Sequence, residues 1–177
     1  MASSLSSRPE LARVKATVDK AEVLALLRQR LAERLEGLTA SQKTTQSGAF
    51  HAETKQENPK DTRAIEASYL ARGLAERVET LREGIAALGR LEIRELGDED
   101  AVQLGALVGL CDEEERETVC FLAPAGGGER VPVGDAFVLV VTPHAPMGAS
   151  LVGSRVDDEI EVELPGGKRS VAVRWLR

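Results

Sequence analysis

Apolar residues recur at helical spacing in two long stretches in the first half of the chain. We expect the first helix to begin at Asp19, because an acid at the N-cap followed by Glu22 three residues later resembles a capping box. The leucines after this start are separated by steps of three and four residues, which indicates one apolar helix face: Leu24, Leu27, Leu31, Leu35 and Leu38. The pattern fades after Thr39, so this helix is expected to end near Lys43.

The second stretch carries a seven-residue apolar repeat. Its start is predicted at Asn58, because Asn favours the N-cap, Pro59 suits the first helical position, and Asp61 faces the free N–H groups. The repeat then continues without a break: Ala71, Leu74, Val78, Leu81, Ile85 and Leu88. Such repeats on two successive helices indicate a coiled coil. Because the link between them is short, we expect an antiparallel hairpin within one chain, with pairing between chains as the alternative.

Beyond Leu91 the helical period gives way to short apolar runs typical of strands. The predicted strands are residues 101–110, 117–122, 137–141, 159–164 and 170–176. Residues 112–115 and 165–167 are expected to be tight turns, and residues 142–153 a loop with one helical turn at most. The predicted fold class is therefore α+β, with an N-terminal antiparallel helical hairpin (coiled coil) followed by a C-terminal antiparallel sheet domain.

The distribution of charge divides the chain where the pattern does. Residues 1–90 hold 15 basic and 12 acidic side chains, whereas residues 91–177 hold 8 and 17. Three parts are expected: a flexible tail at residues 1–18, the coiled-coil hairpin at residues 19–90 with an acidic tip near residues 50–61, and the sheet domain at residues 91–177.

Composition excludes several classes of protein. Hydrophobic residues make up 42% and charged residues 29% of the chain, which is typical of a globular protein. The amino terminus lacks the apolar run of a signal peptide, and no stretch is long enough to span a membrane, so we expect a cytoplasmic protein without a membrane partner. Cys111 and Cys120 show no metal-binding spacing and are expected to be buried and reduced.

Charged side chains crowd the link between the two helices. The nearby cations can approach RNA or DNA phosphate. The acids are Glu53, Glu57, Asp61 and Glu66, and the cations are Lys55, Lys60 and Arg63. The alternative interpretation of this segment is a solvated turn with a helix cap.

Several segments of the second half follow one another in an order seen in a known family. Thr142-Pro143 is followed by the run 149–154 (Ala-Ser-Leu-Val-Gly-Ser), by an acidic strand at residues 157–162, and by Leu164-Pro165-Gly166-Gly167-Lys168. Behind a helical hairpin, this order resembles the Gre family of bacterial transcript-cleavage factors. The resemblance covers roughly residues 20–177 and is strongest from residue 101 onward.

The resemblance implies a transcription elongation factor that is not itself an enzyme. The sheet domain would have an FKBP-like fold and would dock on RNA polymerase, at the rim of the secondary channel, through Pro143, Met147, Leu151 and Gly153. The hairpin would enter the channel and reach the 3′ end of the nascent RNA. Its tip acids would help to hold the second Mg²⁺ of the polymerase active centre while the polymerase cleaves backtracked RNA. We expect a monomer that binds no cofactor by itself.

The family pattern at the tip is Asp-x-x-Glu-Asn, and this chain departs from it. When the helix caps are aligned, Asn58 takes the place of the first acid and Asp61 that of the second. Glu57 could replace the missing acid, so Asp61 and Glu57 are the predicted metal-holding pair, with Glu53, Asn58 and Glu66 supporting the tip. Two functions follow: stimulation of cleavage or, alternatively, regulation or inhibition from the same channel without cleavage.

Two further classes remain as alternatives. An FKBP-like prolyl isomerase would need an aromatic-lined pocket, and the second half of the chain offers only Phe121, Phe137 and Trp175, the last expected in the core. The second alternative class is a coiled-coil dimer without a polymerase role. Light scattering would detect it as a dimer.

Overall fold

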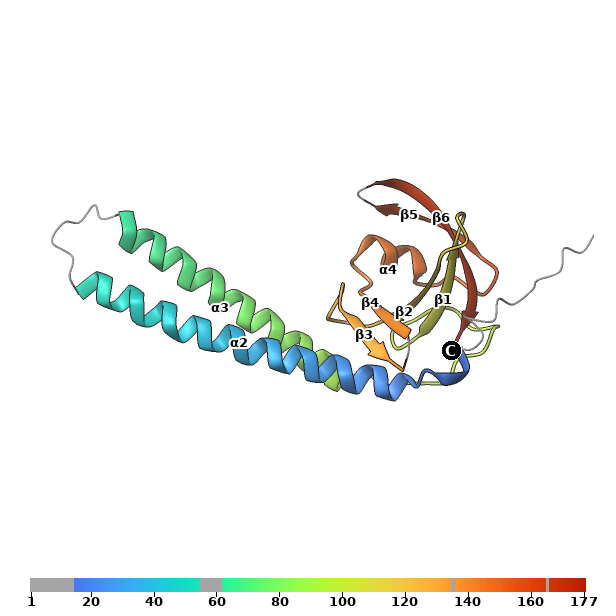
Figure 1. Ribbon diagram of the computed structural model, residues 1–177, viewed down its shortest axis with the longest axis horizontal. Helices are drawn as coiled ribbons and strands as arrows, with labels where there is room; N and C mark the ends of the chain where they lie inside the picture. Colours follow the sequence, from blue (N-terminus) through green and yellow to red (C-terminus); the bar gives the residue numbers. More distant parts are fainter. Residues whose placement is uncertain (1–14, 55–61, 135, 165) are drawn as a thin grey trace, which may run out of the picture. The chain divides into compact units, whose positions relative to one another are not determined.

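The computed structural model describes residues 15–54, 62–134, 136–164 and 166–177. The chain divides into two compact units. The sheet unit comprises the chain up to Leu27 together with Ala87–Arg177, and the arm unit comprises Arg28–Ala86. The arm unit holds most of two paired helices, and the sheet unit holds a predominantly antiparallel sheet (Figure 1). The predicted fold class of helical hairpin plus sheet domain is thereby confirmed.

The first long helix, α2 (Lys20–Thr54), begins at the predicted cap. The Asp19 carboxylate accepts a hydrogen bond from the N–H of Ala21 at 3.0 Å, which satisfies one of the free donors of the first turn. The predicted end near Lys43 is wrong, because the helix continues to Thr54. The polar residues there remain compatible with a helix, since the hydroxyls of Ser41, Thr44 and Ser47 each donate to the carbonyl four residues earlier.

The second long helix, α3 (Thr62–Gly89), carries the predicted apolar repeat. Its predicted start at Asn58 lies outside the described residues. In the arm unit, Leu31 of α2 and Val78 of α3 are almost inaccessible to solvent, as expected where apolar residues of two helices meet. The other repeat residues of the arm unit are half-buried: Ala71, Leu74, Leu81 and Ile85.

The sheet has six strands in the order β3-β4-β2-β1-β6-β5. The strands are β1 (Leu107–Asp112), β2 (Glu117–Leu122), β3 (Arg130–Val133), β4 (Ala136–Val141), β5 (Glu159–Leu164) and β6 (Gly167–Leu176). Neighbouring strands are antiparallel except for β2 and β4, which are parallel. The strand predicted at 101–110 begins only at Leu107, and the edge strand β3 was not predicted.

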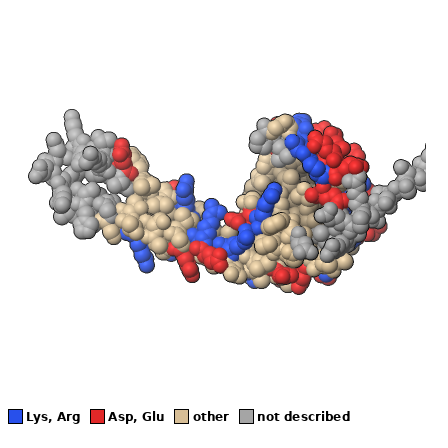
Figure 2. Space-filling view, viewed as in Figure 1, with Lys and Arg blue, Asp and Glu red and all other residues tan. Residues whose placement is uncertain are grey.

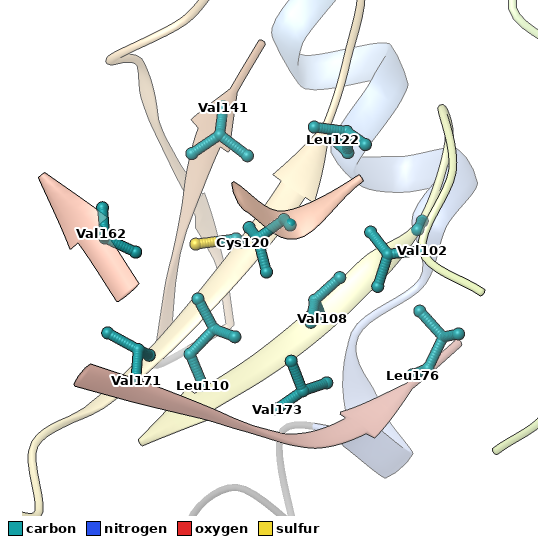
Figure 3. Close-up of a cluster of buried hydrophobic side chains, with 12 residues drawn as sticks. Val102, Val108, Leu110, Cys120, Leu122, Val141, Val162, Val171, Val173 and Leu176 are labelled. Carbon is teal, nitrogen blue, oxygen red and sulfur yellow. The ribbon is translucent and has the colours of Figure 1, made fainter. Parts of the chain in front are cut away.

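One face of the sheet carries the main hydrophobic core. Its side chains converge from β1, β2, β4, β5 and β6, together with Leu151 of the short helix α4 (Pro146–Leu151) (Figure 3). Cys120 belongs to this core, and Cys111 is also buried, as the sequence predicted. Trp175 is buried as predicted too, and it packs so closely on Gly109 that a Cβ there would lie 2.1 Å from the indole nitrogen.

The segment before α2 is held against the rest of the sheet unit. The guanidinium of Arg177, at the end of β6, donates to the carbonyls of Lys15 at 3.0 Å and Val18 at 3.1 Å. Lys20 is buried, and its ammonium donates to the carbonyl of Arg94. Burial lowers the pKa of Lys20. Residues 15–18 therefore differ from the predicted flexible tail, whereas residues 1–14 lie outside the described residues.

Candidate functional site

Most of the predicted tip lies outside the described residues. This applies to five of the site residues: Lys55, Glu57, Asn58, Lys60 and Asp61. Glu53 lies at the end of α2, Arg63 lies at the start of α3, and Glu66 is exposed on α3. The pairing of Asp61 with Glu57 as Mg²⁺ ligands therefore remains a prediction. Within the described residues, no group of three or more His, Cys, Asp or Glu side chains could hold a metal ion.

The described part of the arm nearest the tip presents apolar side chains to solvent. On α3, Ile65, Tyr69 and Leu70 are all more than half exposed, with Tyr69 at 69%. Ile65 and Tyr69 are four residues apart and lie on one helix face, opposite the apolar repeat that meets α2. The sequence analysis did not single out these residues, although their positions outside the seven-residue repeat were a usable signal.

The predicted docking segment, residues 142–153, connects β4 to α4 and continues beyond it. The carbonyl of Thr142 accepts a hydrogen bond from the N–H of Ala145 at 3.0 Å, which turns the chain into α4. Gly148 then lies directly against this turn, since a Cβ at residue 148 would lie 2.0 Å from the Thr142 carbonyl oxygen. Only glycine allows the helix and the end of β4 to approach this closely.

Hydrogen bonds also fix the far end of the docking segment. The N–H of Gly153 donates to the carbonyl of Val102 at 2.9 Å, and the N–H of Val102 donates to the carbonyl of Ser154 at 2.8 Å. Gly153 has a φ of 84°, a left-handed conformation that favours glycine. The hydroxyl of Ser150 donates to the carbonyl of Glu161 on β5 at 2.9 Å. The part of the segment from Ser150 onward is therefore attached to the residues around it.

The four predicted docking residues differ in accessibility. Gly153 is exposed, and Pro143 and Met147 are half-buried. Met147 packs against the core, with its sulfur 3.7 Å from the Cys120 sulfur. Leu151 is 0% exposed and belongs to the core, so it supports the segment from inside instead of contacting a partner.

Burial raises the pKa of Cys120 to about 12, which keeps this sulfur a neutral thiol beside Met147.

The acidic run at residues 112–115 forms the predicted turn between β1 and β2. The Asp112 carboxylate accepts hydrogen bonds from the backbone N–H groups of Glu114 and Arg116 and from the Arg116 guanidinium. The backbone hydrogen bond from Arg116 is the largest cause of a lowered pKa at Asp112. This turn and the exposed acids at residues 157–159 lie toward the same end of the sheet, because β6 pairs Val171 with Asp112 on one side and Ala172 with Glu159 on the other. Figure 2 shows acidic side chains gathered on one side of the sheet unit.

Residues 97–174, which span β1 to β5 and most of β6, match the family model described as the C-terminal domain of the transcription elongation factors GreA and GreB. Residues 97–174 of this chain are therefore similar to the C-terminal domain of the GreA/GreB family. The match supports the resemblance noted in the second half of the sequence.

Two curated proteins are similar to part of this chain. The transcription elongation factor GreA of Rhodospirillum rubrum is 31% identical over 78 residues, which cover 44% of this chain and 46% of the relative. GreA of Staphylococcus saprophyticus is 38% identical over 80 residues, which also cover 44% of this chain and 46% of the relative. The chain thus spans less than half the length of these relatives.

Among solved structures, the GreA factor homolog Gfh1 of Thermus thermophilus is 24% identical to this chain. The likeness covers 85% of this chain and 94% of Gfh1, with a TM-score of 0.36. At that TM-score the likeness carries no argument. No described helix is long and apolar enough to cross a membrane.

Proposed function

We propose that this protein is a Gre-like elongation factor that binds RNA polymerase, inserts its helical tip into the secondary channel and stimulates cleavage of backtracked RNA. The match of residues 97–174 to the GreA/GreB C-terminal domain carries this proposal. The paired helices that precede that domain supply the arm that such a function needs. The protein acts as a cytoplasmic monomer, and the polymerase carries out the reaction.

Docking depends on the sheet unit. The segment at residues 142–153 offers Pro143, Met147 and Gly153 to the polymerase, with Leu151 anchored in the core beneath them. Because this segment follows β4 directly and its far part is hydrogen-bonded to Val102 and Glu161, little conformational freedom is lost when it binds.

The tip supplies the acids in this proposal. Asp61 and Glu57 together hold an Mg²⁺ of the polymerase active centre, and Glu53, Asn58 and Glu66 support them. Carboxylates suit this ion, which takes only one or two from a protein and keeps several waters. In phosphodiester hydrolysis, such an ion activates the attacking water or stabilises the leaving oxygen. Lys55, Lys60 and Arg63 lie close enough along the chain to contact the RNA 3′ end.

The tip sequence favours a second candidate function. Asn58 stands where the family pattern has an acid, and a neutral amide is a weaker ligand for Mg²⁺ than a carboxylate. A factor that docks with an incomplete acid pair would regulate or inhibit the polymerase from within the channel, without stimulating cleavage.

Transcript cleavage in a stalled, backtracked complex distinguishes the two functions. We expect the parent protein to accelerate cleavage, and Asp61→Ala and Glu57→Ala to reduce that acceleration by orders of magnitude while polymerase binding is unchanged. Glu76→Ala is the matched control: it removes an exposed acid on α3 that has no part in the predicted tip, and it should leave cleavage unchanged.

Each other outcome has a definite meaning. Full cleavage by both alanine variants would refute the assignment of the two acids. A parent protein that binds polymerase without accelerating cleavage would favour the regulator or inhibitor. A parent protein that does not bind polymerase would refute both functions.

A further inference from the structure

The helix α2 begins, and the helix α3 ends, within the sheet unit. This unit includes the chain up to Leu27, and it resumes at Ala87, shortly before α3 ends at Gly89. The chain therefore enters and leaves the arm from one compact unit. Side chains of the sheet unit tie the entering segment, residues 15–20, to the leaving segment, residues 94–98.

Arg177 lies between these two segments. Its guanidinium donates to the carbonyls of Lys15 at 3.0 Å and Val18 at 3.1 Å, and its Nε lies 3.3 Å from the Glu95 carboxylate. Its own backbone is fixed, because the N–H and the carbonyl of Arg177 both hydrogen-bond to Leu107 at 2.9 Å. Figure 1 shows the end of the chain beside the segment that leads into α2. One residue thus joins the entering segment, the leaving segment and the start of β1.

Two lysines join the same segments directly. Lys20 is buried at the start of α2, and its ammonium donates to the carbonyl of Arg94. The Lys15 ammonium lies 3.1 Å from the Asp98 carboxylate, but both side chains are exposed, so this ion pair contributes little. The bond from Lys20 is therefore the stronger of the two direct ties.

The bonds to backbone carbonyls are the main ties between the segments. Hydrogen bonds from charged donors are stronger than neutral ones, and both Arg177 and Lys20 make such bonds. The Glu95 side chain is 75% exposed, so its ion pair with Arg177 adds less. The three charges still act on one another: burial lowers the pKa of Lys20, Glu95 opposes that change, and Arg177 adds to it. We call Arg177, Lys20 and the carbonyls they bind the base clasp.

We propose that Arg177 is a positioning residue, which closes the base of the helical hairpin and keeps the start of α2 fixed on the sheet unit while the factor acts. This inference rests on the proposed function, in which the sheet unit docks and the arm carries the tip acids. From the base clasp, α2 continues without a break to Thr54, so a released first turn would loosen the helix that leads to the tip. Since catalysis depends steeply on the placement of the reacting groups, a loosened base lowers the rate of cleavage without weakening docking.

The existence of the base clasp is tested in the full-length protein without polymerase. Arg177→Met removes the side-chain bonds to both carbonyls, whereas the backbone bonds to Leu107 and the tie through Lys20 remain and keep the variant folded. Lys15→Met is the matched control, because it removes only an exposed ion pair from the same segment. Hydrogen exchange at the amides of residues 23–27 should be about tenfold faster in Arg177→Met and unchanged in Lys15→Met, while β1 and β2 exchange as in the parent.

The positioning role is tested by transcript cleavage at increasing concentrations of the factor. In Arg177→Met the maximal cleavage rate should fall about tenfold, while the concentration that gives half-maximal cleavage stays unchanged. Lys15→Met should match the parent in both values. If the parent inhibits the polymerase instead, its maximal inhibition is compared in the same way.

Each contrary result overturns a stated part of the inference. Unchanged hydrogen exchange in Arg177→Met would refute the base clasp. Faster exchange with an unchanged maximal effect would make Arg177 a stabilising contact only, and a raised half-maximal concentration with an unchanged maximal effect would place it in docking. A parent that does not bind polymerase would refute the proposed function and the positioning role together, whereas hydrogen exchange would still decide whether the base clasp exists.

Discussion

At the scale of single residues, the docking segment depends on a close approach that only one residue type permits. Gly148 faces the carbonyl of Thr142, and a backbone atom cannot move aside as a flexible side-chain end can. The sequence resemblance identified this segment, but it could not show that Leu151 is buried while Gly153 is exposed. That difference depends on how α4 lies over the core, which sequence spacing alone does not determine.

Gly148→Ala should destabilise the sheet unit by about 2 kcal/mol or more, because the new Cβ forces α4 away from the end of β4. Gly37→Ala is the matched control, since no atom lies within 4 Å of a Cβ at that exposed helical position. Alanine there should be neutral or stabilising by about 0.5–1 kcal/mol. The free energy of unfolding of each variant is measured by urea titration monitored by circular dichroism. Equal stabilities of the two variants would contradict the close approach of Gly148 to the Thr142 carbonyl.

At the scale of elements, the sequence predicted helices and strands best where one periodicity was sustained. β2 and β5 have the predicted bounds, because β2 is a short apolar run, β5 alternates polar and apolar residues, and turn residues adjoin both. β3 was missed because Arg-Val-Pro-Val is short and contains a proline, which disfavours interior strands. The end of α2 was missed because its last part lacks an apolar stripe, although its hydroxyls bond within the helix.

The pairing of α2 with α3 gives a prediction at this scale. Leu31 is almost fully buried in the arm unit, so Leu31→Ala should cost about 2–4 kcal/mol and lower the helical melting temperature. Leu81→Ala should cost less, because Leu81 is only half-buried. Circular dichroism at 222 nm during thermal unfolding measures both changes. A larger loss for Leu81→Ala would show that the helices meet along a different stripe.

At the scale of the whole molecule, the sheet unit and the arm unit have different parts in the proposed activity. The sheet unit carries the family match and the docking segment, and the arm unit carries helices that lead to the predicted acids. The charge asymmetry of the sequence agrees with this division, since the acidic half contains the sheet. The tip acids could be assigned only by analogy, because Asn58 breaks the family pattern and capping alone does not decide between Asp61 and Glu57 as the main ligand.

The most direct test of the account is site-specific photocrosslinking from the arm. A crosslinking amino acid at Glu66, which is exposed on α3 near the tip, would be placed in full-length protein bound to a backtracked polymerase complex. The account predicts crosslinks to residues that line the secondary channel or to the RNA 3′ end, and their loss in the Pro143→Ala variant. Crosslinks only to a second copy of this chain, or to polymerase surfaces outside the channel, would contradict it.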